Sequence, residues 1–378
     1  MKILIHALGV DMGGALRHLT NFVPELGQAS PHIQYVVLVR DSVPSINTAA
    51  NVKIERVPTA SLFYRSSRLV YDILQIPIRL KREGFAAVVS LVNGGPIWSP
   101  VPHILFQRNA LLYWKPMERL IPTKKRAEIL LRRKLAVLSM MRADLIVTPS
   151  SAMADMIRQI CPRTESRAFT VLYHGCSVGG MGEPIDNRFL QALAQAKGVR
   201  LLYPTHPAPH KGFEILFDTL AILRYRGIEC SLVVTIERSD WPQGIAAYEK
   251  RLQALNLLDK VVFLGRIPQS QMGKIYQECD ILVFPSLCES FGFALLEGMA
   301  HGIPIVASKT AVSQEICGDG ALYYSPLDPR EAATRIQEAM DPVTRSVLVR
   351  RSHQRMQQFD WSWQRYAREF VGLIESVV

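Results

Sequence analysis

The sequence is dominated by short runs of valine, isoleucine and leucine that alternate with longer segments of helical pattern. Such runs, bounded by turn residues, are typical of strands buried on both faces, which pair in parallel and are connected by helices. In the first half of the chain the runs lie at 2–8, 35–39, 86–92, 103–107, 144–150 and 168–173. This alternation predicts a doubly wound α/β sheet.

A glycine-rich stretch near residues 174–188 interrupts the alternation and is interpreted as a linker. A second series of apolar runs follows at 199–205, 230–236, 260–265, 280–286, 303–308 and 321–325. Because 378 residues are too many for one comfortable core, we expect two Rossmann-like domains that face each other across a cleft. Open α/β sheets bind their ligands at the carboxyl ends of the strands, so these ends should face the cleft.

The composition is that of an ordinary globular protein and excludes several other classes. Hydrophobic residues make up 48% of the chain, yet no apolar run approaches the ~20 residues of a membrane-spanning helix. The first residues lack the cleavage site of a secretory signal. The six cysteines form no Cys-x-x-Cys pair, so neither a zinc site nor a disulfide framework is indicated. We expect reduced thiols in the cytoplasm.

The formal net charge of +11 is concentrated in the stretch 108–142, where only Glu118 and Glu128 oppose ten basic residues. Apolar residues interleave with these charges. The pattern fits a protein that rests on an anionic membrane surface, peripheral on its inner face, or one that holds a phosphorylated substrate. It also fits a solvated helical face without a partner. Nucleic acid is not an expected partner, because no nucleic-acid-binding motif accompanies the stretch.

The residues most suggestive of chemistry lie in CESFGFALLEGMA, 288–300, where Glu289 and Glu297 flank a turn at Gly292. This turn enters a predicted helix, whose first N–H groups favour a phosphate, and Gly292 has no side chain to keep one away. Glu297, on about the first turn, could accept hydrogen bonds from a ribose diol, and Glu289 could bind hydroxyls of a group carried on the diphosphate. The alternative is that the glutamates only stabilise the positive end of the helix dipole, which explains Glu289 poorly because it lies before the turn.

The longer stretch 285–308, PSLCESFGFALLEGMAHGIPIVAS, closely resembles the signature of the retaining GT-B glycosyltransferases of family 4, or glycosyltransferase group 1. That signature has two glutamates separated by seven residues, followed by a Gly-x-Pro strand. The similarity is dense from 199 to 329. Outside it, Gly13-Gly14 resembles the amino-terminal glycine loop of the family, and 359–370 resembles its last helix.

The resemblance implies the GT-B fold, in which the two domains bind different substrates. Residues 1–180, together with a returning C-terminal helix in 360–378, would form the acceptor-side domain. Residues 181–359 would form the nucleotide-sugar-binding domain. The implied reaction transfers a sugar from a nucleotide-diphospho-sugar to an acceptor hydroxyl, with retained configuration and without a metal ion or other cofactor.

The resemblance also implies the roles of individual residues. Glu289 would contact the donor sugar and Lys211 would neutralise the departing phosphate. These two are therefore the expected catalytic residues. The alternative for Lys211 is a surface lysine that precedes a helix and has no catalytic role. The remaining donor-binding residues would be Arg266, Ile267, Phe291, Gly292, Phe293, Ala294, Leu295 and Glu297. The acceptor side would include Gly13, Gly14, Gln107 and Asn109.

Two positions depart from the family pattern. Relatives often carry an arginine shortly before the lysine that corresponds to Lys211, as a second phosphate partner. The segment before Lys211 offers Thr205, His206 and His210, none of which is a permanent cation. Arg266 is a candidate replacement for the arginine. Relatives also often have a His-Asp pair after the strand at 103–107, where this chain has Gln107-Arg108-Asn109. The amides there could still hydrogen-bond a sugar hydroxyl. We expect the nearby His103 to be a buried strand histidine.

The expected acceptor is a glycan or lipid-linked glycan in cell-surface polysaccharide synthesis, because a basic, aliphatic-rich first domain suits an acceptor carried on an anionic lipid surface. Two alternatives remain open. The protein could bind a nucleotide sugar without transferring it, or it could be a sugar-nucleotide epimerase or hydrolase on the same fold.

Overall fold

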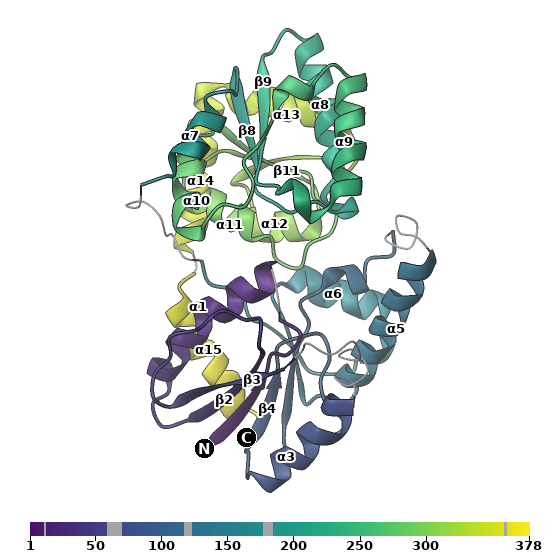
Figure 1. Ribbon diagram of the computed structural model, residues 1–378, viewed down its shortest axis with the longest axis vertical. Coiled ribbons are helices and arrows are strands. Elements are labelled where there is room, and N and C mark those ends of the chain that lie inside the picture. Colours follow the sequence, from purple (N-terminus) through teal and green to yellow (C-terminus); the bar gives the residue numbers. More distant parts are fainter. Residues whose placement is uncertain (11–12, 59–69, 117–122, 177–183, 359–360) are drawn as a thin grey trace. The chain divides into compact units, whose positions relative to one another are not determined.

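The computed structural model describes residues 1–10, 13–58, 70–116, 123–176, 184–358 and 361–378. The chain forms two compact units, each with its own parallel sheet (Figure 1). Unit 1 comprises Met1–Gly175 and Trp361–Val378, and unit 2 comprises Cys176–Asp360. The predicted linker spans the change of unit, and its residues 177–183 lie outside the described residues.

Unit 1 has, among its described residues, a seven-stranded sheet in the order β3-β2-β1-β4-β5-β6-β7. Every neighbouring pair is parallel. The strands are β1 Lys2–His6, β2 Gln34–Arg40, β3 Val52–Val57, β4 Ala87–Ser90, β5 His103–Phe106, β6 Leu145–Thr148 and β7 Phe169–Val171. The longer helices are α1 Gly13–Ala29, α3 Ile76–Arg82, α5 Thr123–Met140, α6 Ser151–Ile160 and α15 Trp363–Glu375.

Unit 2 has, in the part of the chain described, a six-stranded parallel sheet in the order β10-β9-β8-β11-β12-β13. Its strands are β8 Val199–Tyr203, β9 Cys230–Val234, β10 Val261–Phe263, β11 Ile281–Phe284, β12 Ile305–Ser308 and β13 Ala321–Tyr324. Its helices are α7 Asn187–Leu193, α8 Phe213–Tyr225, α9 Pro242–Ala254, α10 Gln269–Gln277, α11 Phe293–Ala300, α12 Ala311–Cys317, α13 Pro329–Met340 and α14 Pro342–Gln357. The predicted doubly wound α/β class is confirmed for both units.

The strand order of each sheet reverses once, between β1 and β4 in unit 1 and between β8 and β11 in unit 2. At such a point the connections leave two adjacent strands in opposite directions, and the space outside their carboxyl ends is where doubly wound proteins bind ligands. The fold therefore directs attention to the loops after β8 and β11, and to those after β1 and β4.

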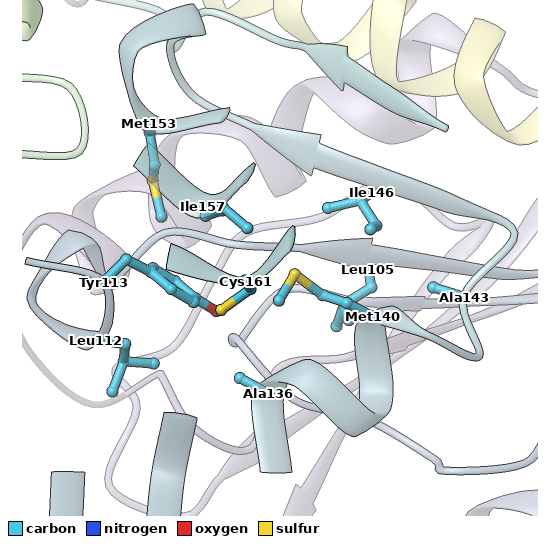
Figure 2. Close-up of a cluster of buried hydrophobic side chains, with 10 residues drawn as sticks. All are labelled: Leu105, Leu112, Tyr113, Ala136, Met140, Ala143, Ile146, Met153, Ile157 and Cys161. Atoms are coloured by element: carbon cyan, nitrogen blue, oxygen red, sulfur yellow. The ribbon is translucent and has the colours of Figure 1, made fainter. Parts of the chain in front are cut away.

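The core of unit 1 includes a cluster of buried apolar side chains that joins strands β5 and β6 to helices α5 and α6. Figure 2 shows the side chains of Tyr113, Met140 and Cys161 among those turned into this cluster. All six cysteines of the chain are buried and form no disulfide. None of the described helices has the length and apolar character needed to cross a membrane.

Helix α15 follows unit 2 in the sequence but belongs to unit 1, where it lies beside α1 (Figure 1). Its buried residues recur every three or four positions, so that they form one apolar face. The ring of Phe22 on α1 lies 5.0 Å from that of Phe370 and 5.5 Å from that of Tyr366. This aromatic contact helps to attach the carboxyl-terminal segment to unit 1.

Candidate functional site

The two predicted catalytic residues form a direct ion pair at the strand-order reversal of unit 2. Lys211 ends the short helical turn Pro209–Lys211 after β8, and Glu289 lies in the loop after β11. Lys211 Nζ is 2.6 Å from Glu289 Oε1, and only 9% and 18% of the two side chains are exposed. The pairing depends on the adjacency of β8 and β11, which brings together residues 78 positions apart in the sequence.

The loops that carry this pair are held together by their backbones. The N–H of Leu287 donates to the carbonyl of His210 over 2.9 Å, and the hydroxyl of Tyr203 donates to the carbonyl of Lys211 over 2.9 Å. Gly212 adopts a left-handed conformation with φ of 67°, and a Cβ atom there would lie 2.6 Å from the carbonyl oxygen of Pro285. Only glycine allows the loops to approach this closely.

The surroundings of Glu289 favour its charged form. Burial alone would raise the pKa of Glu289, but the charge and hydrogen bond of Lys211, together with a hydrogen bond from Ser286, hold it below the ordinary value of 4.5. Ser286 Oγ donates to Glu289 Oε1 over 2.7 Å. Burial and the charge of Lys211 lower the pKa of His210 to about 4 and also lower that of His206. These histidines therefore do not replace the missing arginine as cations near neutral pH.

The second signature glutamate, Glu297, is buried within α11. It is the fifth residue of this helix and so lies on the second turn, not on about the first turn as expected. Only 5% of the residue is exposed. Its carboxylate accepts hydrogen bonds from Gln269 Nε2 over 2.8 Å and from the hydroxyl of Tyr276 over 3.0 Å. These contacts fix the orientation of the carboxylate before any ligand is present.

The turn that enters α11 has the geometry of an anion-binding helix start. Gly292 precedes the helix with φ of 86°, in the left-handed region that favours glycine. The backbone of α11 begins at Phe293, and the first turn of an α-helix directs its N–H groups outward from the helix end. The ring of Phe291 is buried and lies 5.4 Å from that of Phe293, while Leu295 is fully buried. These side chains hold the turn in place, and Ala294 is part-buried between them.

Arg266, the candidate replacement for the absent arginine, is engaged by an acid. It lies in the segment after β10, and its side chain is 76% exposed and paired with Asp240. The hydrogen bond and charge of Asp240 raise the pKa of Arg266. Ile267 follows it and is half-buried. The structure does not bring Arg266 into contact with Lys211 or Glu289, so this pairing does not favour Arg266 as their partner on a phosphate.

The predicted acceptor-side residues of unit 1 fall into two groups. Gly13 and Gly14 are exposed at the start of α1, and Gly13 has a φ of 60°. Gln107 is fully buried, accepts a hydrogen bond from Tyr113 over 2.7 Å and donates one to the carbonyl of Asn93 over 3.2 Å. Because both ends of its amide have internal partners, this arrangement does not favour Gln107 as a sugar ligand.

Asn109 is likewise used by its own loop. Its side chain accepts a hydrogen bond from the N–H of Leu111 over 3.1 Å and so begins the short helical turn Ala110–Leu112. His103 is buried in β5, as expected, with Nε2 2.9 Å from Ser90 Oγ. Burial, together with the neighbouring His6, lowers the pKa of His103 to about 3.

Two residues of this region were not predicted as site residues. Asn93, after β4, has a positive φ of 34° and accepts hydrogen bonds from the N–H groups of Arg108 and Asn109 over 2.6 and 2.8 Å. Arg108 extends from the loop after β5 to α1, where its Nη1 donates to His18 Nδ1 over 2.9 Å. The Asn-Gly-Gly sequence after the β4 run was the available indication for Asn93, because asparagine and glycine tolerate left-handed turns.

The described residues of unit 2 thus offer a lysine, two oriented carboxylates and a helix start. Such groups suit a diphosphate that carries polyhydroxyl groups at its ends. Among the described residues, no group of three or more histidine, cysteine, aspartate or glutamate side chains is placed to hold a metal ion.

Comparison with known sequences finds a family model that matches most of unit 2. Residues 188–351 match the family described as Glycosyl transferases group 1. The chain is 28% identical over 138 residues to the O-antigen chain mannosyltransferase RfbU of Salmonella typhimurium, covering 35% of this chain and 38% of that protein. It is 28% identical over 244 residues to the D-inositol 3-phosphate glycosyltransferase of Saccharomonospora viridis, covering 60% and 52%. The matches thus span between about a third and a half of these relatives.

Solved structures share the fold over the whole chain. The sucrose-phosphate synthase of Thermosynechococcus elongatus has a TM-score of 0.73 at 17% identity, covering 100% of this chain and 98% of that one. Anabaena Alr3699/HepE, solved in complex with UDP and glucose, has a TM-score of 0.72 at 16% identity, with both chains covered completely. These likenesses confirm the GT-B fold.

Proposed function

This chain carries a Glycosyl transferases group 1 domain in residues 188–351 within a GT-B fold, and from this premise we propose that it is a retaining glycosyltransferase. It would move a sugar from a nucleotide-diphospho-sugar to an acceptor hydroxyl. The observation that carries the proposal is the buried Lys211–Glu289 ion pair at the strand-order reversal of unit 2.

Each part of the donor has a candidate partner in unit 2. The N–H groups that begin α11 would bind the diphosphate, and Glu297, oriented by Gln269 and Tyr276, would accept hydrogen bonds from the ribose. Glu289 would contact the hydroxyls of the donor sugar. Lys211 has three ammonium protons, one of which is directed at Glu289, so the others are available for the departing phosphate.

In the proposed reaction, breaking the bond between the sugar and the phosphate leaves negative charge on the phosphate oxygen. Lys211 would stabilise that charge in a site largely closed to water, where electrostatic stabilisation is strongest. The acceptor hydroxyl would attack from the face on which the phosphate leaves, and its proton would pass to that phosphate. This route gives retention of configuration without a metal ion.

The first donor to test is UDP-glucose, because the solved structure of HepE is described in complex with it. The full chain should be screened by thermal shift against UDP-, GDP- and ADP-sugars, since a ligand that binds only the native state raises its melting temperature. Transfer of radiolabelled sugar to added acceptors then separates a transferase from a protein that only binds. Free sugar released into water would indicate the hydrolase alternative.

A pair of variants ties donor binding to the proposed site. Glu297→Gln should abolish the stabilisation by the preferred nucleotide sugar, because the amide cannot accept both ribose hydrogen bonds. Glu214→Gln, on helix α8 of the same unit, should leave it unchanged. Equal stabilisation of both variants would contradict the assignment of the donor site.

The acceptor side is proposed to rest on an anionic membrane through α5. Leu131 and Leu138, seven positions apart on this helix, are 58% and 49% exposed, and Arg132 and Lys134 beside them are exposed as well. A face that combines apolar and basic side chains suits the headgroup region of an anionic bilayer. Arg119, part of the predicted basic stretch, lies outside the described residues. Flotation with phosphatidylglycerol vesicles should recover the protein at moderate salt; its absence from the vesicle fraction would remove the membrane proposal.

A further inference from the structure

Helix α14 of unit 2 (Figure 1) carries a basic surface that the proposed reaction does not use. Of its 16 residues only Leu348 and Ser352 are buried, so most of the helix lies at the surface. From its first residue to its last, the helix contains no aspartate or glutamate. Its basic residues are Arg345, Arg350, Arg351, His353 and Arg355. Helix α14 therefore has a local excess of positive charge.

The side chains of this helix border a hollow of about 530 Å³. Its basic lining residues are Arg345, Arg350 and His353. Its other lining residues include the hydroxyl of Ser346 and the amides of Gln354 and Gln357, which can also donate hydrogen bonds. Sites for small molecules in proteins usually measure about 300–1,000 Å³. The hollow is therefore large enough for a small molecule, and its donor groups suit an anion.

The two arginines of the hollow are not used by the fold, unlike the other two arginines of the helix. Arg351 pairs with Asp319 over 3.5 Å, and Arg355 donates to two backbone carbonyls in the last turn of α12. Within the described residues, the side chains of Arg345 and Arg350 have neither an ion pair nor a hydrogen bond. Their guanidinium groups are therefore available to a ligand in the hollow.

The spacing of these arginines indicates a ligand with two separate anionic groups. Arg345 and Arg350 are five positions apart, which on an α-helix corresponds to a rise of about 7.5 Å and to different sides of the axis. They therefore border the hollow from two sides. Around the axis, His353 falls between them. One small ligand can thus place a different anionic group at each guanidinium group.

Phosphate groups match this surface better than carboxylates do. A surface arginine gains little from a single negative charge, because water and salt screen the pair. A phosphate monoester carries a charge of about −1.5 to −2 at pH 7. It also offers three oxygens, which the planar guanidinium group can bind in pairs. A molecule with two phosphate groups would give each arginine of the hollow such a partner.

The hollow is separate from the proposed donor site, although both lie against the same helix. Helix α14 packs on α11, whose first residue, Phe293, marks the proposed diphosphate site. His353 lies instead near Gly302, which follows the other end of α11: a Cβ at Gly302 would be 3.2 Å from His353 Nε2. Neither Lys211 nor Glu297 lines the hollow. A ligand there would not occupy the groups proposed to bind the donor.

We propose that Arg345 and Arg350, together with His353, bind a small molecule that carries two phosphate groups. This site goes beyond the proposed glycosyl transfer, because its ligand would bind beside the nucleotide sugar and not in its place. The phosphates could belong to a sugar bisphosphate or to an inorganic oligophosphate, because both present the same groups.

Isothermal titration of the full chain with fructose 1,6-bisphosphate tests the site without any transfer reaction. Arg345→Gln/Arg350→Gln should weaken binding at least about tenfold, as expected for lost charge-assisted hydrogen bonds. Both side chains lie at the surface of one helix, so the melting temperature should not change. The same comparison in the Lys211→Ala background separates this binding from any phosphate binding at the donor site. Unchanged affinity in both comparisons would overturn the proposal.

A matched control is Arg226→Gln/Lys250→Gln. Both residues are exposed in unit 2, after α8 and on α9, and neither lines the hollow. This variant loses the same charge and should bind as the wild type does; an equal loss would show that general charge governs binding. Arg345→Lys/Arg350→Lys keeps the charge but not the planar geometry, so it should bind more weakly than the wild type. Full binding by the lysine variant would contradict recognition by guanidinium groups.

Related probes identify the groups that are recognised. Fructose 6-phosphate, with one phosphate group, and citrate, with carboxylates only, should each bind at least about tenfold more weakly than fructose 1,6-bisphosphate. Equal binding by either would contradict a site for two phosphates. Tighter binding of inorganic tripolyphosphate than of the sugar bisphosphate would identify the inorganic source, and binding of neither would overturn the inference.

The failure of the proposed function is seen separately from the failure of this site. Stabilisation by nucleotide sugars is proposed to depend on Glu297 and should persist in Arg345→Gln/Arg350→Gln. Conversely, Glu297→Gln should still bind fructose 1,6-bisphosphate as the wild type does. Loss of both kinds of binding in either variant would show that the hollow and the donor site are one, which contradicts the inference.

Discussion

The Lys211–Glu289 ion pair is the most constrained contact among the predicted site residues. Both side chains are largely buried, and each is the principal charge partner of the other. Breaking a buried pair by removing one partner leaves the other charge uncompensated, which is more damaging than losing the pair as a whole. Substitutions at these positions therefore affect stability as well as chemistry, and the two effects must be separated.

Lys211→Ala should reduce turnover by about 10²–10³, the usual effect of losing one group that stabilises a leaving oxyanion. It should also lower the melting temperature, because Glu289 remains buried without its cation. The double variant Lys211→Ala/Glu289→Gln should recover much of the stability but none of the turnover. Recovery of activity in the double variant would show that Lys211 acts only as a structural partner. Lys274→Ala, which removes an exposed lysine paired with Glu278, is the control and should change neither quantity.

The depressed pKa of Glu289 makes stability depend on pH in a definite direction. A carboxylate whose pKa is lower in the folded than in the unfolded state contributes stability above the unfolded value, here about 4.5, and loses it as the pH falls through the folded value. The melting temperature of the wild type should therefore fall more steeply below about pH 4.5 than that of Glu289→Gln. Parallel curves for the two proteins, measured by calorimetry from pH 3 to 7, would contradict the assigned direction.

Sequence reasoning found the charged residues of unit 2 but not their contact. Glu289 and Glu297 stand out because glutamates interrupt an apolar segment. The ion pair with Lys211 follows from strand order, which local pattern does not encode. In unit 1, the prediction named the amides of Gln107 and Asn109 and not Arg108 between them. Which of these side chains extends out of the loop depends on how β5 packs against its neighbours, which the local sequence does not encode.

At the scale of the element, the loop after β8 depends on one glycine. Gly212→Ala should reduce the free energy of unfolding by more than about 1 kcal/mol, since alanine is strained at positive φ. Its Cβ would also meet the carbonyl oxygen of Pro285, so the loops must separate and Lys211 must move from Glu289. Activity should fall with stability. Chemical denaturation and turnover measure the two effects.

The matched control for that variant is Gly227→Ala. Gly227 has a φ of 75°, similar to that of Gly212, but a Cβ there would meet nothing within 4 Å. Gly227→Ala should lose only the free energy of unfolding that the strained backbone conformation costs, and its turnover should be unchanged. If both variants lose activity equally, the close approach of the two loops has no role in catalysis.

The apolar runs predicted most of the strands because a parallel strand covered on both faces has to be apolar throughout. Strand β3 was missed for the converse reason. It lies at the edge of its sheet and mixes apolar residues with the charged Lys53, Glu55 and Arg56. Glu297 lies further along its helix than predicted, because α11 begins only after the left-handed Gly292. The amino-acid pattern defines the first residue of a helix only to within a few positions.

At the scale of the whole molecule, the chain divides into two compact units, and we expect each to contribute its own unfolding transition. Phe370→Ala, on α15, should destabilise unit 1 by about 3–5 kcal/mol, because it removes a buried ring that packs on Phe22. Phe217→Ala, on α8, should do the same to unit 2. Scanning calorimetry should show that each variant shifts a different transition. A common shift in both variants would show that the units unfold as one.

The place of α15 in unit 1 has a consequence for biosynthesis. Helix α1 emerges from the ribosome early, with an aromatic face whose partner is encoded some 340 residues further on. All the elements of unit 2 are encoded before the helix that covers Phe22, whereas unit 1 stays incomplete, with Phe22 exposed, until that helix has been made. A released chain truncated after Asp360 should therefore hold a finished unit 2 and a unit 1 that chaperones still recognise.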